Sequence, residues 1–224
     1  MHQISDPSIL YFGTPVVLIS TLNEDDSPNL APISSAFWLG WRCMIGISVF
    51  SKTTQNLLRT KQAVLNLPSV NQVAAVNRLA LTTGSNPVPV GKTQKGYCYE
   101  PDKFQRAGLT PSLSDLVAPP RVMECPVQLE VHLMASHPIA EEHESVRGRL
   151  LSLELKVLRV HLETDILLKG YTNRVDADKW RPLIMSFQEF YGLGPKLQPS
   201  ALAGIAEDLY RSPETPTIVR VQPI

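Results

Sequence analysis

The chain has 224 residues, of which 43% are hydrophobic, enough for one large domain or two small ones. Its 21 basic and 21 acidic residues give a formal net charge of zero, which excludes a global attraction to nucleic acid or to an anionic membrane. The three cysteines form no CxxC pair, so we expect reduced, buried thiols at Cys43, Cys98 and Cys125.

The sequence carries no sign of export or of membrane insertion. The first residues, MHQISDPSIL, lack the basic and apolar blocks of a signal peptide, and no apolar run approaches the roughly 18 residues that a membrane span needs. We therefore expect a soluble, cytoplasmic protein with small-molecule partners, and we expect neither nucleic acid nor membrane as a partner.

The first third of the chain alternates strand and helix patterns. Runs of β-branched and aromatic residues at 15–22 and 41–50 predict strands, with the turn-forming NEDDSPN between them. Helix formers at 52–61 are followed by a short buried strand at 63–68. A second helix is predicted at 70–80, where apolar residues recur at three- and four-residue spacing.

The later part of the chain predicts a long loop and then a hairpin. Residues 83–120 are rich in Gly, Pro, Ser and Thr, with a short helix near 102–107. A loop of this length is uncommon unless it covers a site or an interface, and a decorative insertion is the alternative. Long strands at 121–136 and 146–163 flank a polar tip and predict a large antiparallel hairpin. A further helix is predicted at 200–211.

This order of elements lacks the regular alternation of a doubly wound sheet. It predicts a mainly β protein, a closed antiparallel barrel with peripheral helices in a single domain.

Several familiar catalytic patterns are missing. Ser34 and Ser35 lie in APISSAF and not in the G-x-S-x-G elbow of a serine hydrolase. In GKTQKG at 91–96, Asn86 stands where a P-loop has its first glycine, and no GxGxxG follows the first strand. No metal site is predicted, because a solvated hairpin tip accounts for three histidines that lack metal-ligand spacing: His132, His137 and His143.

Two segments favour a ligand. SVFSKTTQNLLRTKQAVLNLP, at 48–68, joins a strand to a helix through small polar and basic residues, which directs N–H groups, hydroxyls and an ammonium to one region and suits an anion. An ordinary N-cap is the alternative. SPNLAPISSAFWLG, at 27–40, predicts irregular backbone between strands, whose unpaired groups can bind a planar heterocycle such as a flavin.

Several motifs, in order, resemble those of the flavin reductase-like family, whose fold is the FMN-binding split β-barrel. They are NEDDSPNLAPISSAF, WRCMIGISVF, KTTQNLL, AVLNLP, EPDKFQRAGLTPS, VAPPRVMECPVQLEV and VRGRLLSLELKVLRV. The resemblance covers roughly residues 11–195. It implies a split antiparallel β-barrel with peripheral helices, in one domain over 1–224, with a C-terminal extension at 196–224.

The resemblance also implies an FMN site, with the isoalloxazine ring near 34–37 and the phosphate near 48–54. The residues expected to bind FMN are Ser34, Ser35, Ala36, Phe37, Ser48, Val49, Ser51, Lys52, Thr53 and Thr54. Two departures from the family pattern are Thr53, where Asp is common, and RGRLLSL, where a G-x-V strand is usual. Phe37, Trp38 and Trp41 are near enough in sequence to cover the ring, and the alternative for each is a place in the core, which we favour for Trp41.

By this resemblance we expect a homodimeric oxidoreductase that transfers a hydride from NADH or NADPH to FMN. No catalytic acid or base is expected, because the flavin performs the chemistry. Two alternatives are an electron carrier or oxygenase acting on an organic substrate, and a barrel that binds without catalysis. In this family flavin lies at a subunit boundary, so the loop at 83–120 and the FYGLG segment around Tyr191 are expected to cover the site or form the interface.

Overall fold

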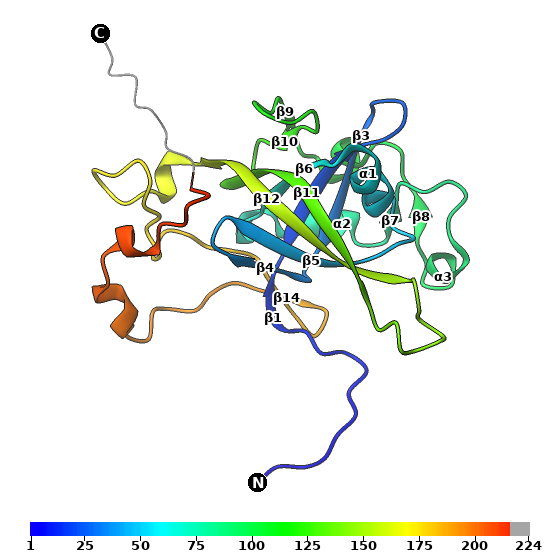
Figure 1. Cartoon of the computed structure of the whole chain (residues 1–224), viewed down its shortest axis with the longest axis horizontal. Coiled ribbons are helices and arrows are strands. Elements are labelled where there is room, and N and C mark those ends of the chain that lie inside the picture. Colours follow the sequence, from blue (N-terminus) through cyan, green and yellow to red (C-terminus); the bar gives the residue numbers. More distant parts are fainter. Residues whose placement is uncertain (216–224) are drawn as a thin grey trace.

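The computed structural model describes residues 1–215, and its largest sheet contains seven antiparallel strands in the order β3-β2-β6-β11-β12-β5-β4 (Figure 1). The sheet curls around a core, which confirms the predicted mainly β architecture. Its strands are β2 (Val17–Leu22), β3 (Pro28–Ile33), β4 (Ala36–Leu39), β5 (Arg42–Ser48), β6 (Gln62–Leu67), β11 (Val127–Ile139) and β12 (Leu150–Leu162).

Helices and short strands surround this sheet. The helices are α1 (Lys52–Thr60), α2 (Val73–Leu79), α3 (Val90–Thr93) and α4 (Lys103–Ala107), with 3-10 turns η1 (Val70–Gln72), η2 (Thr164–Ile166), η3 (Ala201–Gly204) and η4 (Glu207–Tyr210). Three small sheets pair β1 (Phe12–Pro15), β13 (Ile184–Ser186) and β14 (Glu189–Tyr191); β7 (Thr82–Thr83) and β8 (Cys98–Tyr99); and β9 (Pro111–Ser112) and β10 (Arg121–Val122). None of the helices described over residues 1–215 is long and apolar enough to cross a membrane.

Strand β2 lies between two apolar clusters, which explains why Val17, Leu18 and Ile19 are consecutive apolar residues. Successive side chains of a strand point to opposite faces. Val17 and Ile19 join the cluster inside the curled sheet, whereas Leu18 joins a second cluster beneath α2 and α4. The contacts of Leu18 with residues of α2 and α4 hold these helices against the outside of the barrel.

The segment at 27–40 is more regular than predicted. It forms β3 and β4, and only Ser34 and Ser35 interrupt the strands. The prolines of this segment led to the prediction of irregular backbone. However, β3 is an edge strand that pairs with β2 alone, so there is no second neighbouring strand to which Pro28 and Pro32 would have to donate an N–H. The predicted strand at 15–22 is also divided, because β1 leaves the main sheet and pairs with β13.

The predicted hairpin at 121–163 exists with shifted boundaries. Its first strand begins at Val127 and continues to Ile139, so the tip starts three residues later than predicted. Past His132, β11 pairs with β12 alone, and Pro138 is tolerated there because no third strand needs its N–H.

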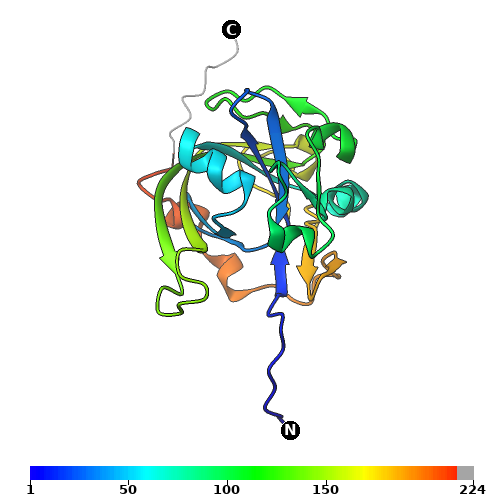
Figure 2. The same ribbon diagram turned by 90° about the vertical axis from the view of Figure 1, so that its right-hand side faces the viewer.

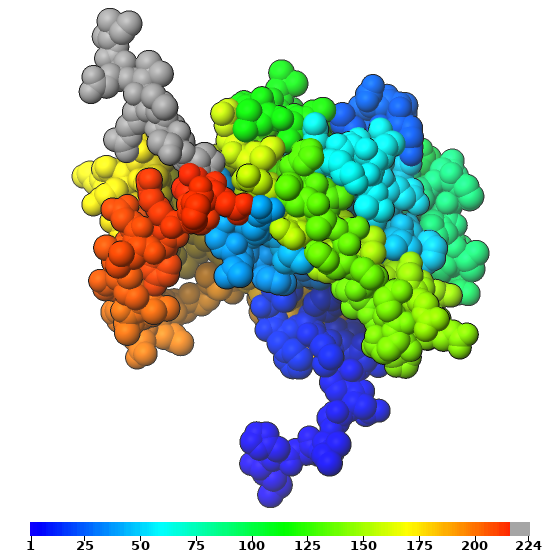
Figure 3. Space-filling model, in the orientation of Figure 1, coloured from blue at the N-terminus to red at the C-terminus, as the bar shows by residue number. Residues whose placement is uncertain are grey.

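The predicted helix at 200–211 is wrong, because the segment forms the two separate turns η3 and η4. Leu202 and Leu209 are exposed, so no buried apolar face stabilises a continuous helix. The segment runs along the left flank of the molecule in Figure 3. Beyond its end, Glu214 pairs with Arg42 of β5. The last residues of the extension predicted at 196–224, residues 216–224, lie outside the described part of the chain.

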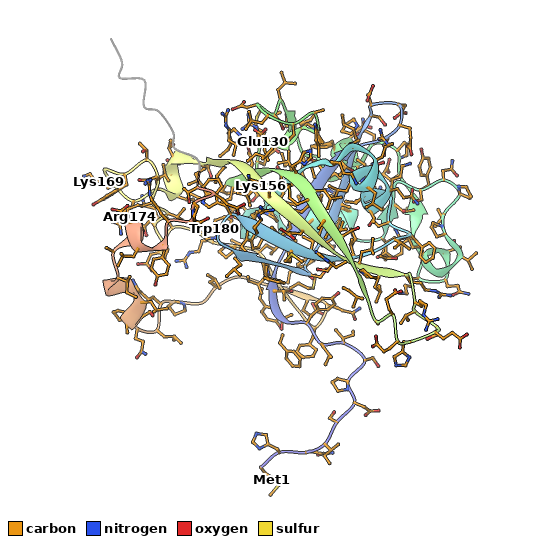
Figure 4. The ribbon with its side chains drawn as sticks, viewed as in Figure 1. Met1, Glu130, Lys156, Lys169, Arg174 and Trp180 are labelled. Carbon is orange, nitrogen blue, oxygen red and sulfur yellow. The ribbon has the colours of Figure 1, made fainter. Side chains whose placement is uncertain are left out.

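A second ion pair links the 200–211 segment to the chain between η2 and β13. The Nε of Arg174, labelled in Figure 4, lies 2.9 Å from Oε1 of Glu207. Two further side chains bear on the sequence predictions. Cys98 is exposed on β8, contrary to the prediction of three buried thiols, whereas Trp41 is partly buried and packs against the core.

The two parts of the segment at 83–120 have different roles. The second part is fixed to the barrel by the buried carboxylate of Glu130, which accepts hydrogen bonds from the N–H groups of Asp115, Leu116 and Val117. Its first part contains α3 and the predicted short helix, α4, and lies near α1 at the right-hand end of the barrel in Figure 1; Figure 2 views this end directly. This first part contributes to the site.

Candidate functional site

Two adjoining cavities lie beside β3. The larger has a volume of about 430 Å³ and the smaller about 110 Å³. They form one continuous depression, because four residues line both of them: Pro32, Ile33, Ala80 and Tyr97. The site therefore has a wide part and a narrow part.

Three lysines from separate segments line the smaller cavity. Lys52 begins α1, Lys92 lies on α3, and Lys103 begins α4. Ser51 and Thr53 line the cavity beside Lys52. Because ammonium groups, a hydroxyl residue and the start of a nine-residue helix converge on a small volume, the cavity is suited to an anion with several oxygen acceptors.

Lys103 is the most deeply buried of these cations. The residue is only 2% exposed, and burial lowers the pKa of its ammonium to about 8, with the charge of Lys92 as a second cause. Over residues 1–215 its ammonium makes no ion pair. An anion in the cavity would favour the charged form and raise this pKa again.

The other two lysines have partners. Nζ of Lys52 lies 2.6 Å from a carboxylate oxygen of Glu24, and this hydrogen bond lowers the pKa of that exposed carboxyl. Nζ of Lys92 donates to Oγ1 of Thr83 at 3.2 Å and lies 5.6 Å from the ring centroid of Tyr97. Burial lowers the pKa of Lys92 as well. Of the three, Lys52 alone pairs with a carboxylate from the described residues 1–215.

The first turn of α1 leaves polar groups free for a ligand. Ser51 is the N-cap residue, but its side chain makes no capping hydrogen bond. The first N–H groups of a helix have no partner within the helix. In contrast, Thr53 accepts a hydrogen bond from Asn29 at 3.2 Å, and Thr54 donates to the carbonyl of Ser48 at 2.7 Å. The two threonines therefore attach the helix to the barrel.

Gly84, at the end of β7, allows the close approach of this strand to α1. A Cβ atom there would lie 2.6 Å from Oδ1 of Asn29 and 3.2 Å from Cγ of Lys52. The first distance is shorter than any ordinary contact, so a side chain at this position would displace Asn29 or Lys52. The wall of the smaller cavity requires glycine here.

The larger cavity combines apolar walls with a polar end. Val16, Val76 and Phe190 contribute apolar surface, and Ser34 and Ser35 lie where β3 ends. Ser35 is held in place, since its hydroxyl donates to the carbonyl of Gly46 at 2.5 Å and its own carbonyl accepts the N–H of Gly46 at 2.8 Å. The volume is in the range of cofactor sites, and the lining suits a planar ring.

The structure brings together half of the predicted FMN-binding residues. Ser34 and Ser35 line the larger cavity, and Ser51, Lys52 and Thr53 line the smaller one. The remaining predicted residues line neither cavity: Ala36, Phe37, Ser48, Val49 and Thr54. Phe37 is 61% exposed on the edge strand β4, so within this chain it covers no ring.

Sequence reasoning missed two of the three lysines. Lys92 lies in GKTQKG, which is no P-loop, and Lys103 lies in DKFQRAGLT, a motif that carried the resemblance without a role for its lysine. Each lysine lies in a segment that the sequence analysis had singled out, GKTQKG or DKFQRAGLT, but the sequence does not show that the two segments meet. The folded chain places both lysines with Lys52 around the smaller cavity.

A sequence model of the flavin reductase-like domain matches residues 9–169. The chain belongs to the flavin reductase-like family. The uncharacterized protein YdfE of Bacillus subtilis (strain 168) is 37% identical over 188 residues, which are 84% of this chain and 87% of YdfE. Family membership implies that the protein binds a flavin and that its function is of the flavin reductase type.

Solved structures confirm the predicted split-barrel fold. Flavoredoxin of Desulfovibrio vulgaris (Miyazaki F) aligns with a TM-score of 0.71 and 20% identity, over 92% of this chain and all of flavoredoxin. The NADH:FAD oxidoreductase SgcE6 of Streptomyces globisporus C-1027 aligns with a TM-score of 0.58 and 13% identity, over 82% of this chain and 88% of SgcE6. At these identities the likeness concerns the fold.

Proposed function

We propose that this protein binds FMN and catalyses hydride transfer from NADH or NADPH to it. The observation that carries the proposal is the junction of two unlike cavities, a ring-sized one with apolar walls and a small one with three lysines. FMN has the same two parts, a planar ring and a terminal phosphate joined by a short chain. A flavin without phosphate would leave the lysines unused.

The residues of the smaller cavity would hold the phosphate. Lys52, Lys92 and Lys103 would neutralise its two negative charges, and the start of α1 would donate backbone N–H groups to its oxygens. Ser34 and Ser35 would lie at the polar edge of the ring, with apolar residues against its faces. When bound, the flavin supplies the hydride acceptor, so the protein positions the ring and limits the access of water to it.

Size and charge favour FMN over FAD. The cavity that contains the lysines has a volume of only about 110 Å³, which suits one terminal phosphate better than a diphosphate that continues into a nucleoside. The name of the neighbour SgcE6 includes FAD, so FAD is the natural competitor.

Fluorescence titration with FMN, FAD and riboflavin tests this choice. We expect FMN to bind at least tenfold more tightly than riboflavin, because charge-assisted hydrogen bonds to the phosphate contribute about 1.5–3 kcal/mol. Equal affinity for FMN and riboflavin would contradict the assignment of the lysine cavity to the phosphate, and tighter binding of FAD would contradict the choice of flavin.

We also propose a homodimer, with β4 as part of its interface. Phe37 and Leu39 are 61% and 80% exposed on this edge strand, whose outer edge pairs with no other strand described over residues 1–215. An exposed apolar edge strand favours association. A second copy would cover both side chains. Light scattering should show a dimer, and Leu39→Asp should shift it toward the monomer; a monomeric wild-type protein would contradict this assembly.

A further inference from the structure

The hairpin of β13 and β14 has a strained tip beside the larger cavity. Ser186 pairs with Glu189, so only Phe187 and Gln188 connect the two strands. Both have left-handed backbone conformations, with φ of 47° and 69°. A two-residue turn of this kind strongly prefers Asn-Gly, because side chains with a Cβ are disfavoured at positive φ. The turn therefore retains two unfavourable residues.

Phe187 fixes this tip to the N-terminal strand. Its N–H donates to the carbonyl of Tyr11 at 2.9 Å. Its ring packs edge-to-face on Phe12, with 4.8 Å between the ring centroids, and β13 pairs with β1 below it. The tip is thus held in one position in spite of its backbone strain.

Gln188 is placed by this arrangement at the larger cavity. It lines the cavity together with Met185 and Phe190 of the same hairpin, and Ser34 and Ser35 belong to the same lining. Gln188 is exposed, and its carboxamide makes no hydrogen bond within residues 1–215, so its two donors and its acceptor are open to a ligand. Backbone strain of this kind is characteristic of residues that contact ligands.

We propose that Gln188 recognises the amide edge of a planar ring bound in the larger cavity. Such an edge presents a carbonyl oxygen next to an N–H group, and a carboxamide side chain can pair with both. The pyrimidine part of a flavin and the carboxamide of a nicotinamide both have this chemistry. The inference rests on the proposed function and adds to it a residue that distinguishes ligands by hydrogen bonding.

Two substitutions separate the hydrogen bond from the strain. Gln188→Met retains an unbranched side chain of similar size without the amide, and Gln188→Gly removes the amide and relieves the backbone. Glu189→Gln, at the exposed neighbouring position, is the matched control. The readouts are the melting temperature, the Kd of riboflavin, which has no phosphate, and the KM of NADH and NADPH.

We expect Gln188→Gly to raise the melting temperature by about 2 °C while weakening the ring ligand. Both Gln188 variants should raise either the Kd of riboflavin or the KM of the nicotinamide nucleotides about three- to tenfold. Glu189→Gln should change neither value. A higher Kd of riboflavin identifies the flavin as the ligand of Gln188. A higher KM with an unchanged Kd of riboflavin identifies the nicotinamide.

Two results would overturn the inference. If the unmodified protein binds riboflavin and both Gln188 variants retain its Kd and KM, Gln188 recognises no ligand and the proposed function survives. If the unmodified protein binds neither riboflavin nor FMN, the proposed function itself fails, and this inference fails with it.

Discussion

Replacing Lys103 by methionine should make the flavin-free protein more stable and its FMN binding weaker. Lys103 is 2% exposed, and its pKa of about 8 lies below the ordinary 10.5 because burial penalises the ammonium. A lysine whose folded pKa is lowered destabilises the folded state at every pH below about 8, and this penalty disappears as pH rises from about 8 to 10.5. Methionine retains the unbranched stem without the charge.

The magnitude follows from the pKa. One pKa unit corresponds to about 1.4 kcal/mol, so the lowered value implies a penalty of up to about 3 kcal/mol at neutral pH. Lys103→Met should therefore raise the free energy of unfolding by up to about this amount at pH 7 and by little near pH 10.5. The same change removes a charged contact to the phosphate, which should weaken FMN about ten- to hundredfold.

Urea denaturation at both pH values and fluorescence titration with FMN and riboflavin measure these effects. The affinity for riboflavin should be unchanged, because it has no phosphate. Lys95→Met, an exposed lysine of the same segment that lines neither cavity, is the control and should change neither property. A variant that is less stable than the wild type and binds FMN equally well would refute the reasoning.

Three further predictions concern the same cavity. FMN affinity should fall as pH rises above about 8, because the phosphate binds the protonated form of Lys103, and Lys103→Met should flatten this titration curve. Glu24→Gln should strengthen FMN binding two- to fivefold, since a surface ion pair is worth about 0.3–1 kcal/mol and Glu24 competes for Lys52; weaker binding would count against it. Gly84→Ala should destabilise the protein by about 1–3 kcal/mol in urea denaturation and weaken FMN, because its Cβ would lie 2.6 Å from Asn29; an unchanged unfolding curve would contradict the tight contact.

The sequence predicts the barrel well where local patterns decide the outcome. The predicted strand at 15–22 and the predicted helix at 52–61 lie close to the observed β2 and α1. Both can be predicted from a single segment, because an apolar run indicates burial on two faces and helix formers indicate a helix. Pattern reasoning failed at 200–211, where helix formers lack a surface to pack against. It also failed at β3, where the edge position tolerates proline.

The candidate site was predictable only in part, because its residues converge from distant segments. The strand-to-helix junction at Lys52 predicts an anion site, and in the structure Lys52 lines the smaller cavity. The motifs that contain Lys92 and Lys103 give no indication that they meet there. Gln188 was missed for a different reason, since no sequence pattern marks a glutamine that occupies a turn suited to glycine.

The central claim is tested most directly by the visible absorption spectrum of the protein. The protein would be mixed with FMN, gel-filtered, and then treated with NADH or NADPH without oxygen. We predict that flavin absorbance co-elutes with the protein and is bleached by at least one of the two nucleotides. Retained flavin that neither nucleotide bleaches would contradict the reductase activity, and the absence of retained flavin at high protein concentration would contradict the proposed FMN site.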